Sequence, residues 1–225
     1  MLMIRSICSV SIEIMAMLLT SCGNMPQDKQ PDNTDVGKYM SKPGKTATGP
    51  KSVLILSSSP RRGGNSEQLC LQFKKGAEEA GHRVDMININ DYDILYFSQT
   101  EYDRQASATE TDDAADIIAR MKKADVIVLS SPVYFYNITA QLKALIDRTY
   151  GHEKDLREKE FYYIATSTDR DEEATDGVFE AFHGFARCLY GSIERGVIRG
   201  NGARNRGDID SHPAMQQAYE MGKGV

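Results

Sequence analysis

The amino-acid sequence predicts a doubly wound α/β domain, in which a five-stranded parallel sheet of order 2-1-3-4-5 carries helices on both faces. Three observations predict this class. From residue 51 onward, five short apolar runs alternate with segments that repeat their apolar residues at helical spacing. The runs over 53–56 and 125–129 are almost wholly apolar, as strands covered on both faces are. The polar segment before them, 23–50, is too poor in apolar residues to share their core.

The first half of the folded region supplies two strands and two helices. The strand over 53–56 is bounded by serines, and the helix over 66–80 that follows it ends at Gly81, a usual stop signal. Residues 83–89 alternate between apolar and polar side chains, which predicts the second strand. A helix over 112–123 begins with acidic residues, which suit the positive end of its dipole.

The second half continues the alternation of strands and helices, which is the pattern of a parallel sheet. A buried strand over 125–129 precedes a helix over 138–150. The remaining predicted elements are a strand over 160–165, a helix over 173–189, a strand over 193–198 and a helix over 215–221.

Composition excludes several functions. The net charge is −5, from 27 basic and 32 acidic residues, which argues against a nucleic-acid-binding protein. No apolar run reaches the roughly 18 residues that a transmembrane helix needs. The four cysteines form no C-x-x-C pair and the four histidines have no metal-ligand spacing, so we expect no metal site. We expect the histidines to be surface or capping residues.

The first fifty residues predict export and a lipid anchor. Residues 1–21 combine a short basic start with an apolar segment that Glu13 interrupts, and they end in small residues. The run L-T-S-C-G at 19–23 resembles a bacterial lipobox, in which Cys22 would be acylated. A flexible tether over 22–50 would then join the anchor to a folded domain over 51–225. The expected location is the bacterial cell envelope, with membrane contact only through Cys22; a misassigned start codon would leave a cytoplasmic protein.

Polar or aromatic loops follow three of the predicted strands, at the sheet edge where ligands bind in such folds. Loop 57–66 combines serines, two arginines and two glycines just before a helix, which suits a phosphate monoester. A solvated turn capped by Asn65 or Ser66 is the alternative. Loop 130–139 holds three consecutive aromatics, which suit stacking on a planar ligand unless two of them pack inward. Loop 166–169 offers hydrogen bonds to a ring edge.

Two motifs carry a resemblance to a known family. The sequences S-S-P-R-R-G-G-N-S at 58–66 and S-P-V-Y-F-Y-N-I-T-A-Q-L-K-A-L-I-D-R at 131–148 resemble the NAD(P)H-dependent FMN reductase branch of the flavodoxin-like superfamily. Segments 200–209 and 218–223 are similar to that family's closing motifs. The resemblance spans about 51–223.

The resemblance implies bound FMN, with NADH or NADPH as co-substrate and a quinone, flavin or similar small molecule as acceptor. The cofactor would perform the chemistry, so no catalytic residue is expected, and Tyr134 and Tyr136 would shape the acceptor pocket. A flavodoxin-like electron carrier without its own substrate, and a flavin-free lipoprotein with an interaction role, are the alternatives. The implied phosphate ligands are Ser59, Arg61, Asn65 and Ser66; the implied isoalloxazine loop is Pro132, Val133, Tyr134, Phe135 and Asn137; and the implied ring-edge residues are Thr166, Ser167 and Asp169.

The chain also departs from its relatives. Many of them carry a cysteine-rich insert after the second strand, but 91–111 has no cysteine here, which excludes an iron–sulfur cluster. Relatives often dimerise over the flavin, so we expect a homodimer with helix 138–150 and insert 91–111 at its surface; alternatively, the insert's aromatics cover the sheet edge. Right-handed crossovers put Cys70 and Cys188 on opposite faces, so we expect two buried thiols and no disulfide.

Overall fold

The computed structural model describes residues 49–100 and 112–225, which all belong to one compact unit spanning 41–225. The predicted signal, Cys22 and nearly all of the predicted tether lie outside the described residues. Within the described part, no helix combines the length and apolarity needed to cross a bilayer. No group of three or more His, Cys, Asp or Glu side chains converges there as a metal site would require.

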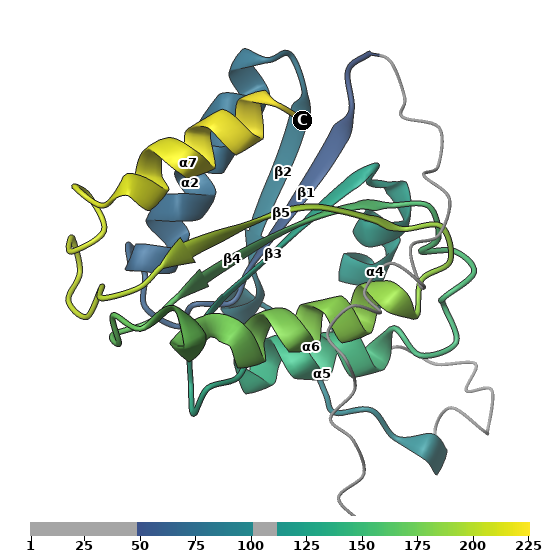
Figure 1. The fold of residues 1–225 in the computed structure, drawn as a ribbon. Coiled ribbons are helices and arrows are strands. Elements are labelled where there is room, and N and C mark those ends of the chain that lie inside the picture. Colours follow the sequence, from purple (N-terminus) through teal and green to yellow (C-terminus); the bar gives the residue numbers. More distant parts are fainter. Residues whose placement is uncertain (1–48, 101–111) are drawn as a thin grey trace, which may run out of the picture. The chain divides into compact units, whose positions relative to one another are not determined.

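The sheet confirms the predicted order and direction: its five strands run in parallel as β2-β1-β3-β4-β5 (Figure 1). β1, β3 and β4 are almost entirely buried, because helices cover them on both faces. The strands are β1 Ser52–Ser57, β2 Arg83–Asn88, β3 Val126–Pro132, β4 Glu160–Thr166 and β5 Ile193–Gly200.

The helices divide between the two faces of the sheet (Figure 1). Successive residues of β1 point to opposite faces and supply the two cores. Val53 and Ile55 pack with α2 and α7, whereas Leu54 and Leu56 pack on the other side with α4, α5 and α6. The helices are α2 Asn65–Glu79, α4 Ala114–Lys123, α5 Ala140–Arg148, α6 Asp176–Arg187 and α7 Pro213–Lys223, with 3₁₀ turns η2 Ile89–Asp91 and η3 Glu172–Thr175.

Several element boundaries differ from the prediction by one to three residues, and two of the shifts follow from ladder or side-chain hydrogen bonds. β3 continues past residue 129 to Pro132, whose partner in β4 is Thr166. α5 begins at Ala140 because the Thr139 hydroxyl accepts the N–H of Leu142, 3.4 Å away. α4 begins two residues later than the acidic pattern indicates.

The two cysteines of the folded region lie on different faces, as the topology predicts, and both are free thiols. Cys70 is buried on α2, and burial raises the pKa of its thiol to about 12. Cys188 is exposed, so the prediction that both thiols are buried was wrong for this residue. It follows the last residue of α6, beyond the apolar stripe that faces the sheet.

A buried Lys51–Glu160 ion pair, joined by the more exposed Arg195, holds the amino-terminal edge of the sheet. The Lys51 ammonium lies 2.9 Å from one carboxylate oxygen of Glu160 and donates to the Val225 carbonyl, and Arg195 Nε lies 2.9 Å from the other oxygen. Burial alone would raise the pKa of Glu160, but hydrogen bonds from Arg195 and Lys51 hold it below its usual 4.5. Burial and the Lys51 charge also lower the pKa of His82. This favours the neutral ring, whose Nδ1 accepts the backbone N–H of Lys51.

Replacing Glu160 with Gln should lower the free energy of unfolding by about 3 kcal/mol at neutral pH, because two cations lose their buried anion. The folded pKa is depressed, so this contribution is present above about pH 4.5 and is lost as pH falls through the folded value. The free energies of unfolding of the wild type and the variant, measured with urea, should therefore become equal in strong acid. If the difference in unfolding free energy between the two proteins stays the same from neutral to acidic pH, the ionised Glu160 carboxylate is not its source.

Candidate functional site

Thr166, the last residue of β4, joins the loops that follow three strands. Its carbonyl accepts the N–H of Val133, 2.8 Å away, at the start of the loop after β3. Its hydroxyl lies 2.5 Å from the Ser66 hydroxyl, in the first turn of α2, and both side chains are buried. The loops after β1, β3 and β4 therefore meet at one residue on the carboxyl edge of the sheet, where the fold class places ligands.

Neighbouring strands fix the loop after β1 from both sides. The Ser58 hydroxyl donates to the Ser130 carbonyl of β3 over 2.8 Å. On the other side, the Asn88 amide donates to the Ser59 carbonyl and the Asn90 amide to the Ser58 carbonyl, each over 3.0 Å. The loop enters α2 in one defined conformation.

α2 starts without a side-chain cap. Gly64 is the N-cap residue and no side-chain hydrogen bond caps the helix, so the alternative of a turn capped by Asn65 or Ser66 was wrong. Both of those residues already lie inside the helix, and their side chains bond to other segments. An uncapped helix start next to Ser59 and Arg61 has the hydrogen-bond donors and the positive dipole end that bind a phosphate group.

The β5–α7 connection lies over this loop, a contact that the sequence did not indicate. The Asn65 amide donates to the carbonyls of Ala203 (3.1 Å) and Asn205 (2.9 Å). Arg61 Nη1 donates to the carbonyl of Arg204 over 3.1 Å. Two of the predicted phosphate ligands thus also hold the closing segment of the chain. The motif at 200–209 was visible in the sequence, but its spatial neighbour was not.

The loop after β3 forms a tight aromatic hairpin. Tyr134 and Asn137 exchange backbone hydrogen bonds of 3.0 Å in both directions, and the two residues between them have positive φ, 50° at Phe135 and 59° at Tyr136. This is the pattern of a type I′ turn, which favours Asn and Gly, so aromatic residues there cost about 1–3 kcal/mol each.

All three aromatic side chains of this hairpin face outward, so the alternative in which two pack inward was wrong. Relative exposure is 44% for Tyr134, 103% for Phe135 and 65% for Tyr136. A strained backbone that carries exposed aromatic rings is not favoured by folding alone, and it points to a functional constraint.

The loop after β4 is tied to the end of β5. The Ser167 hydroxyl accepts the N–H of Asp169 over 3.0 Å, and the Asp169 carbonyl accepts the N–H of Gly202 over 2.7 Å. Thr166 and Ser167 are buried, whereas Asp169 is exposed. Backbone groups of this loop therefore face the β5 segment, and its exposed part adjoins the neighbouring cavity.

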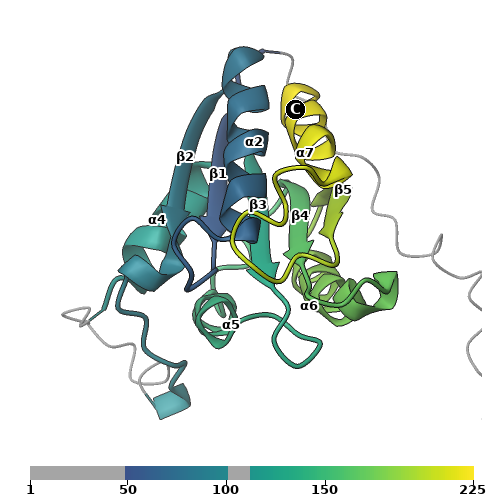
Figure 2. The ribbon, with the colours of Figure 1, turned by 90° about the vertical axis from the view of Figure 1, so that its left-hand side faces the viewer.

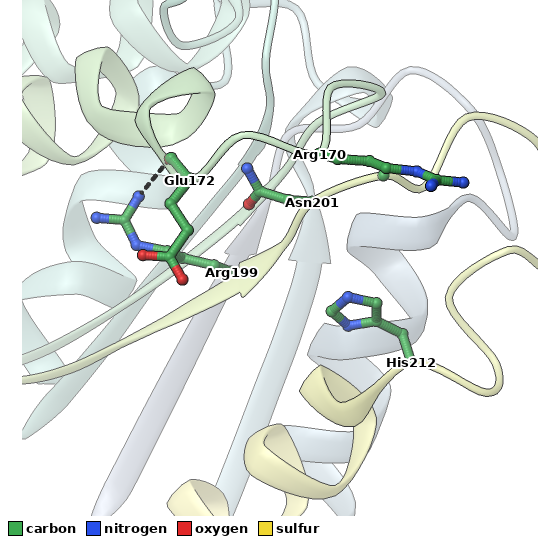
Figure 3. A pocket seen from close by; sticks show the side chains of 6 residues that line it. Arg170, Glu172, Arg199, Asn201 and His212 are labelled. Atoms are coloured by element: carbon green, nitrogen blue, oxygen red, sulfur yellow. Dashed lines mark hydrogen bonds between the residues drawn. The ribbon is translucent and has the colours of Figure 1, made fainter.

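A cavity of about 470 Å³ lies beyond this junction, at the carboxyl ends of β4 and β5 (Figure 3). The Arg199 guanidinium on its wall is already engaged, 2.9 Å from an Asp176 oxygen and stacked 4.5 Å from the Phe179 ring centroid. His212 caps α7, as expected for a histidine of this chain: its Nδ1 accepts the Ala214 N–H. The lining residues are Arg170, Glu172, Arg199, Asn201, Gly202 and His212.

A doubly wound sheet with a phosphate-type loop after its first strand and an aromatic loop after its third is flavodoxin-like. The chain belongs to the NADPH-dependent FMN reductase family, whose model matches residues 52–186, more than half of the sequence.

Named relatives agree with this family. An iron-sulfur flavoprotein of Archaeoglobus fulgidus is 33% identical over 112 residues, covering 48% of this chain and 50% of the relative. An FMN-dependent NADH:quinone oxidoreductase of Pseudoalteromonas atlantica is 28% identical over 109 residues, covering 44% and 54%. The chain spans about half the length of the first curated relatives it matches.

Solved structures show the same fold. The NAD(P)H:quinone oxidoreductase from Methanothermobacter marburgensis matches with a TM-score of 0.62 and 20% identity, over 78% of this chain and 97% of that one. At this identity the likeness establishes the architecture alone.

The residues at the carboxyl edge fit FMN. Its phosphate needs donors and positive charge, which the uncapped α2 start, Ser59 and Arg61 supply. Its planar ring needs an aromatic or apolar surface open to solvent, which the exposed hairpin supplies. The two parts are held together through Thr166, so one ligand can contact both.

A double-mutant cycle should measure that connection. Thr166→Val leaves the Ser66 hydroxyl buried without its partner and should cost about 1–2 kcal/mol of unfolding free energy. Ser66→Ala should cost a similar amount, because it leaves the buried Thr166 hydroxyl without its partner. Because both single changes break one bond, the double variant should be at least about 1 kcal/mol more stable than additivity predicts, by urea unfolding of flavin-free protein. Strict additivity would show that the two hydroxyls are not coupled.

Proposed function

We propose that this chain is an FMN-dependent NAD(P)H oxidoreductase that reduces a quinone, a flavin or a similar small acceptor. The observation that carries the proposal is the joining of a phosphate-type loop and an exposed aromatic hairpin through Thr166, in a member of this family. The names of the relatives, which include NADH:quinone and NAD(P)H:quinone oxidoreductases, support the same reaction class.

The proposed cofactor ligands divide among three loops. The first loop would hold the phosphate through Ser59, Arg61, Asn65 and Ser66. Arg61 and Asn65 would do so next to the 203–205 carbonyls that they already contact, so that segment forms part of the site wall. The hairpin residues Pro132, Val133, Tyr134, Phe135 and Asn137 would contact the ring, and Thr166, Ser167 and Asp169 would line its other edge.

When bound, FMN would supply the redox chemistry, accepting a hydride from the nicotinamide and reducing the acceptor. The protein residues would orient the ring and keep one face open to both substrates in turn. Tyr134 and Tyr136, with exposed rings, would shape the acceptor side of that opening. No side chain is assigned a proton-transfer role.

We also propose a homodimer that covers this opening. The described part of the insert packs on the end of α5 and the turn after it: Arg148 donates to the Leu95 carbonyl, and the Phe97 and Tyr150 rings lie 5.4 Å apart. Leu95 and Tyr96 nevertheless remain exposed beside them. An apolar surface continuous with α5 fits a second copy of the chain better than solvent.

The purified protein should be yellow or should take up added FMN, and anaerobic NADPH or NADH should bleach it. Absorbance near the flavin maximum measures both events. A yellow protein that neither nicotinamide bleaches would instead be an electron carrier. A protein that binds no FMN would defeat both flavin readings.

Arg61→Ala should weaken FMN binding about 10-fold to 100-fold, because a charge-assisted bond to phosphate contributes about 1.5–3 kcal/mol. The matched control is Arg187→Ala, an exposed arginine in the last turn of α6, at the other end of the domain. Flavin fluorescence titration gives both affinities. Equal affinities in the two variants would remove Arg61 from the phosphate site.

We propose that the chain is held in the bacterial cell envelope by a lipid on Cys22, after removal of residues 1–21. Membrane fractions of cells expressing the full chain should contain the protein with acyl mass on residue 22, and Cys22→Ser should release it. Soluble wild-type protein that retains residues 1–21 would contradict the anchor and favour the cytoplasmic alternative.

A further inference from the structure

The start of α6 touches the tip of the aromatic hairpin through a glycine. Gly177 is the second residue of α6, and a Cβ added to it would lie 1.9 Å from the Tyr136 carbonyl oxygen and 3.1 Å from its carbon. Both atoms belong to backbone, so no side-chain rotation relieves the overlap. Figure 2 shows the β3–α5 connection beside the first turn of α6. Any residue other than glycine at 177 must displace the hairpin or the helix.

We propose that Gly177 is a positioning residue for the flavin site: its missing side chain lets the hairpin tip rest against α6, which fixes where Phe135 and Tyr136 present their rings. The inference rests on the proposed function for what those rings contact. The fixed placement itself does not depend on it.

The hairpin needs such a support because its own hydrogen bonds do not fix the orientation of its tip. The mutual bonds of Tyr134 and Asn137 close the turn, and the Val133 N–H anchors its entry on Thr166. Its exit is anchored where the Thr139 N–H donates to the Ser131 hydroxyl over 3.0 Å. All of these bonds lie at the base of the hairpin. The contact with Gly177 is made at the tip, where both residues of positive φ lie.

Backbone strain of this kind persists only where the surroundings enforce it. The fully exposed Phe135 ring has no core to hold it, so the packing of the Tyr136 carbonyl on α6 restricts the tip instead. Since the hairpin is exposed and α6 is packed on the sheet, we expect an added methyl group at 177 to move the hairpin.

The same helix provides a matched control. Gly184 is the other glycine of α6, and a Cβ added there would meet nothing within 4 Å. Gly184→Ala therefore makes the same chemical change without the steric conflict, and alanine suits a helix interior better than glycine.

The test compares Gly177→Ala with Gly184→Ala in the full chain, first without flavin. Chymotrypsin cuts after exposed aromatic residues, and we expect it to cut after residues 134–136 at least about 10-fold faster in Gly177→Ala than in wild type. Gly184→Ala should match wild type. FMN titration should then show an affinity at least about 10-fold weaker for Gly177→Ala alone, with circular dichroism confirming that both variants are folded.

Equal cleavage rates in the two variants would overturn the inference, and so would equal FMN affinities when wild type binds FMN. If wild type binds no FMN, the proposed function fails, but the cleavage comparison still decides whether Gly177 holds the hairpin. If Gly177→Ala does not fold, amide exchange in flavin-free wild type decides. Tyr134 and Asn137 amides as slow as those in the central turn of α6 support a fixed hairpin, and unprotected amides overturn it.

Discussion

The site depends on the position of Thr166, because one residue at the end of β4 bonds to two other loops. Its backbone is fixed by the sheet, between Pro132 of β3 and Gly200 of β5. Its carbonyl and hydroxyl then transmit that position to Val133 and Ser66. A parallel sheet aligns the ends of its strands at one edge, so a short polar side chain there can reach both neighbouring loops. Rigid β structure thus sets the geometry of segments that have no regular structure of their own.

The two edges of the sheet have different physical character. At the amino edge, Lys51, Glu160 and Arg195 satisfy one another, so buried charge is compensated there. At the carboxyl edge, the Asn65 side-chain oxygen is buried without a partner and the hairpin has two non-glycine residues at positive φ. Two adjacent strained residues near a buried polar atom without a partner are typical of a functional site, which a stable framework elsewhere permits.

The strand order and helix faces followed from the sequence because buried parallel strands are continuous apolar runs and crossovers are right-handed. Which loops carry the candidate site followed from the same topology. The contacts within it did not. Asn65 was expected to bind a phosphate or to cap a helix, yet its amide bonds to segment 203–205, which begins 138 residues further along the chain. The exposure of Phe135 was equally hidden, because three adjacent aromatic residues are compatible with either face until the turn conformation is known.

The hairpin shows why its residues are aromatic although its backbone favours small ones. Asn and Gly would adopt positive φ with little cost, and they would close the same turn. Phe135 and Tyr136 accept the strain and expose large rings to solvent, which stabilises nothing within the described domain. The backbone strain and the exposure of the rings are explained if the rings contact something outside the chain, such as a planar cofactor or a second subunit. The proposed contact of the rings with a cofactor requires that the backbone beneath them be held. In the arrangement that we propose, the close approach of Gly177 to the Tyr136 carbonyl holds the tip, while the hydrogen bonds of Tyr134 and Asn137 close the base.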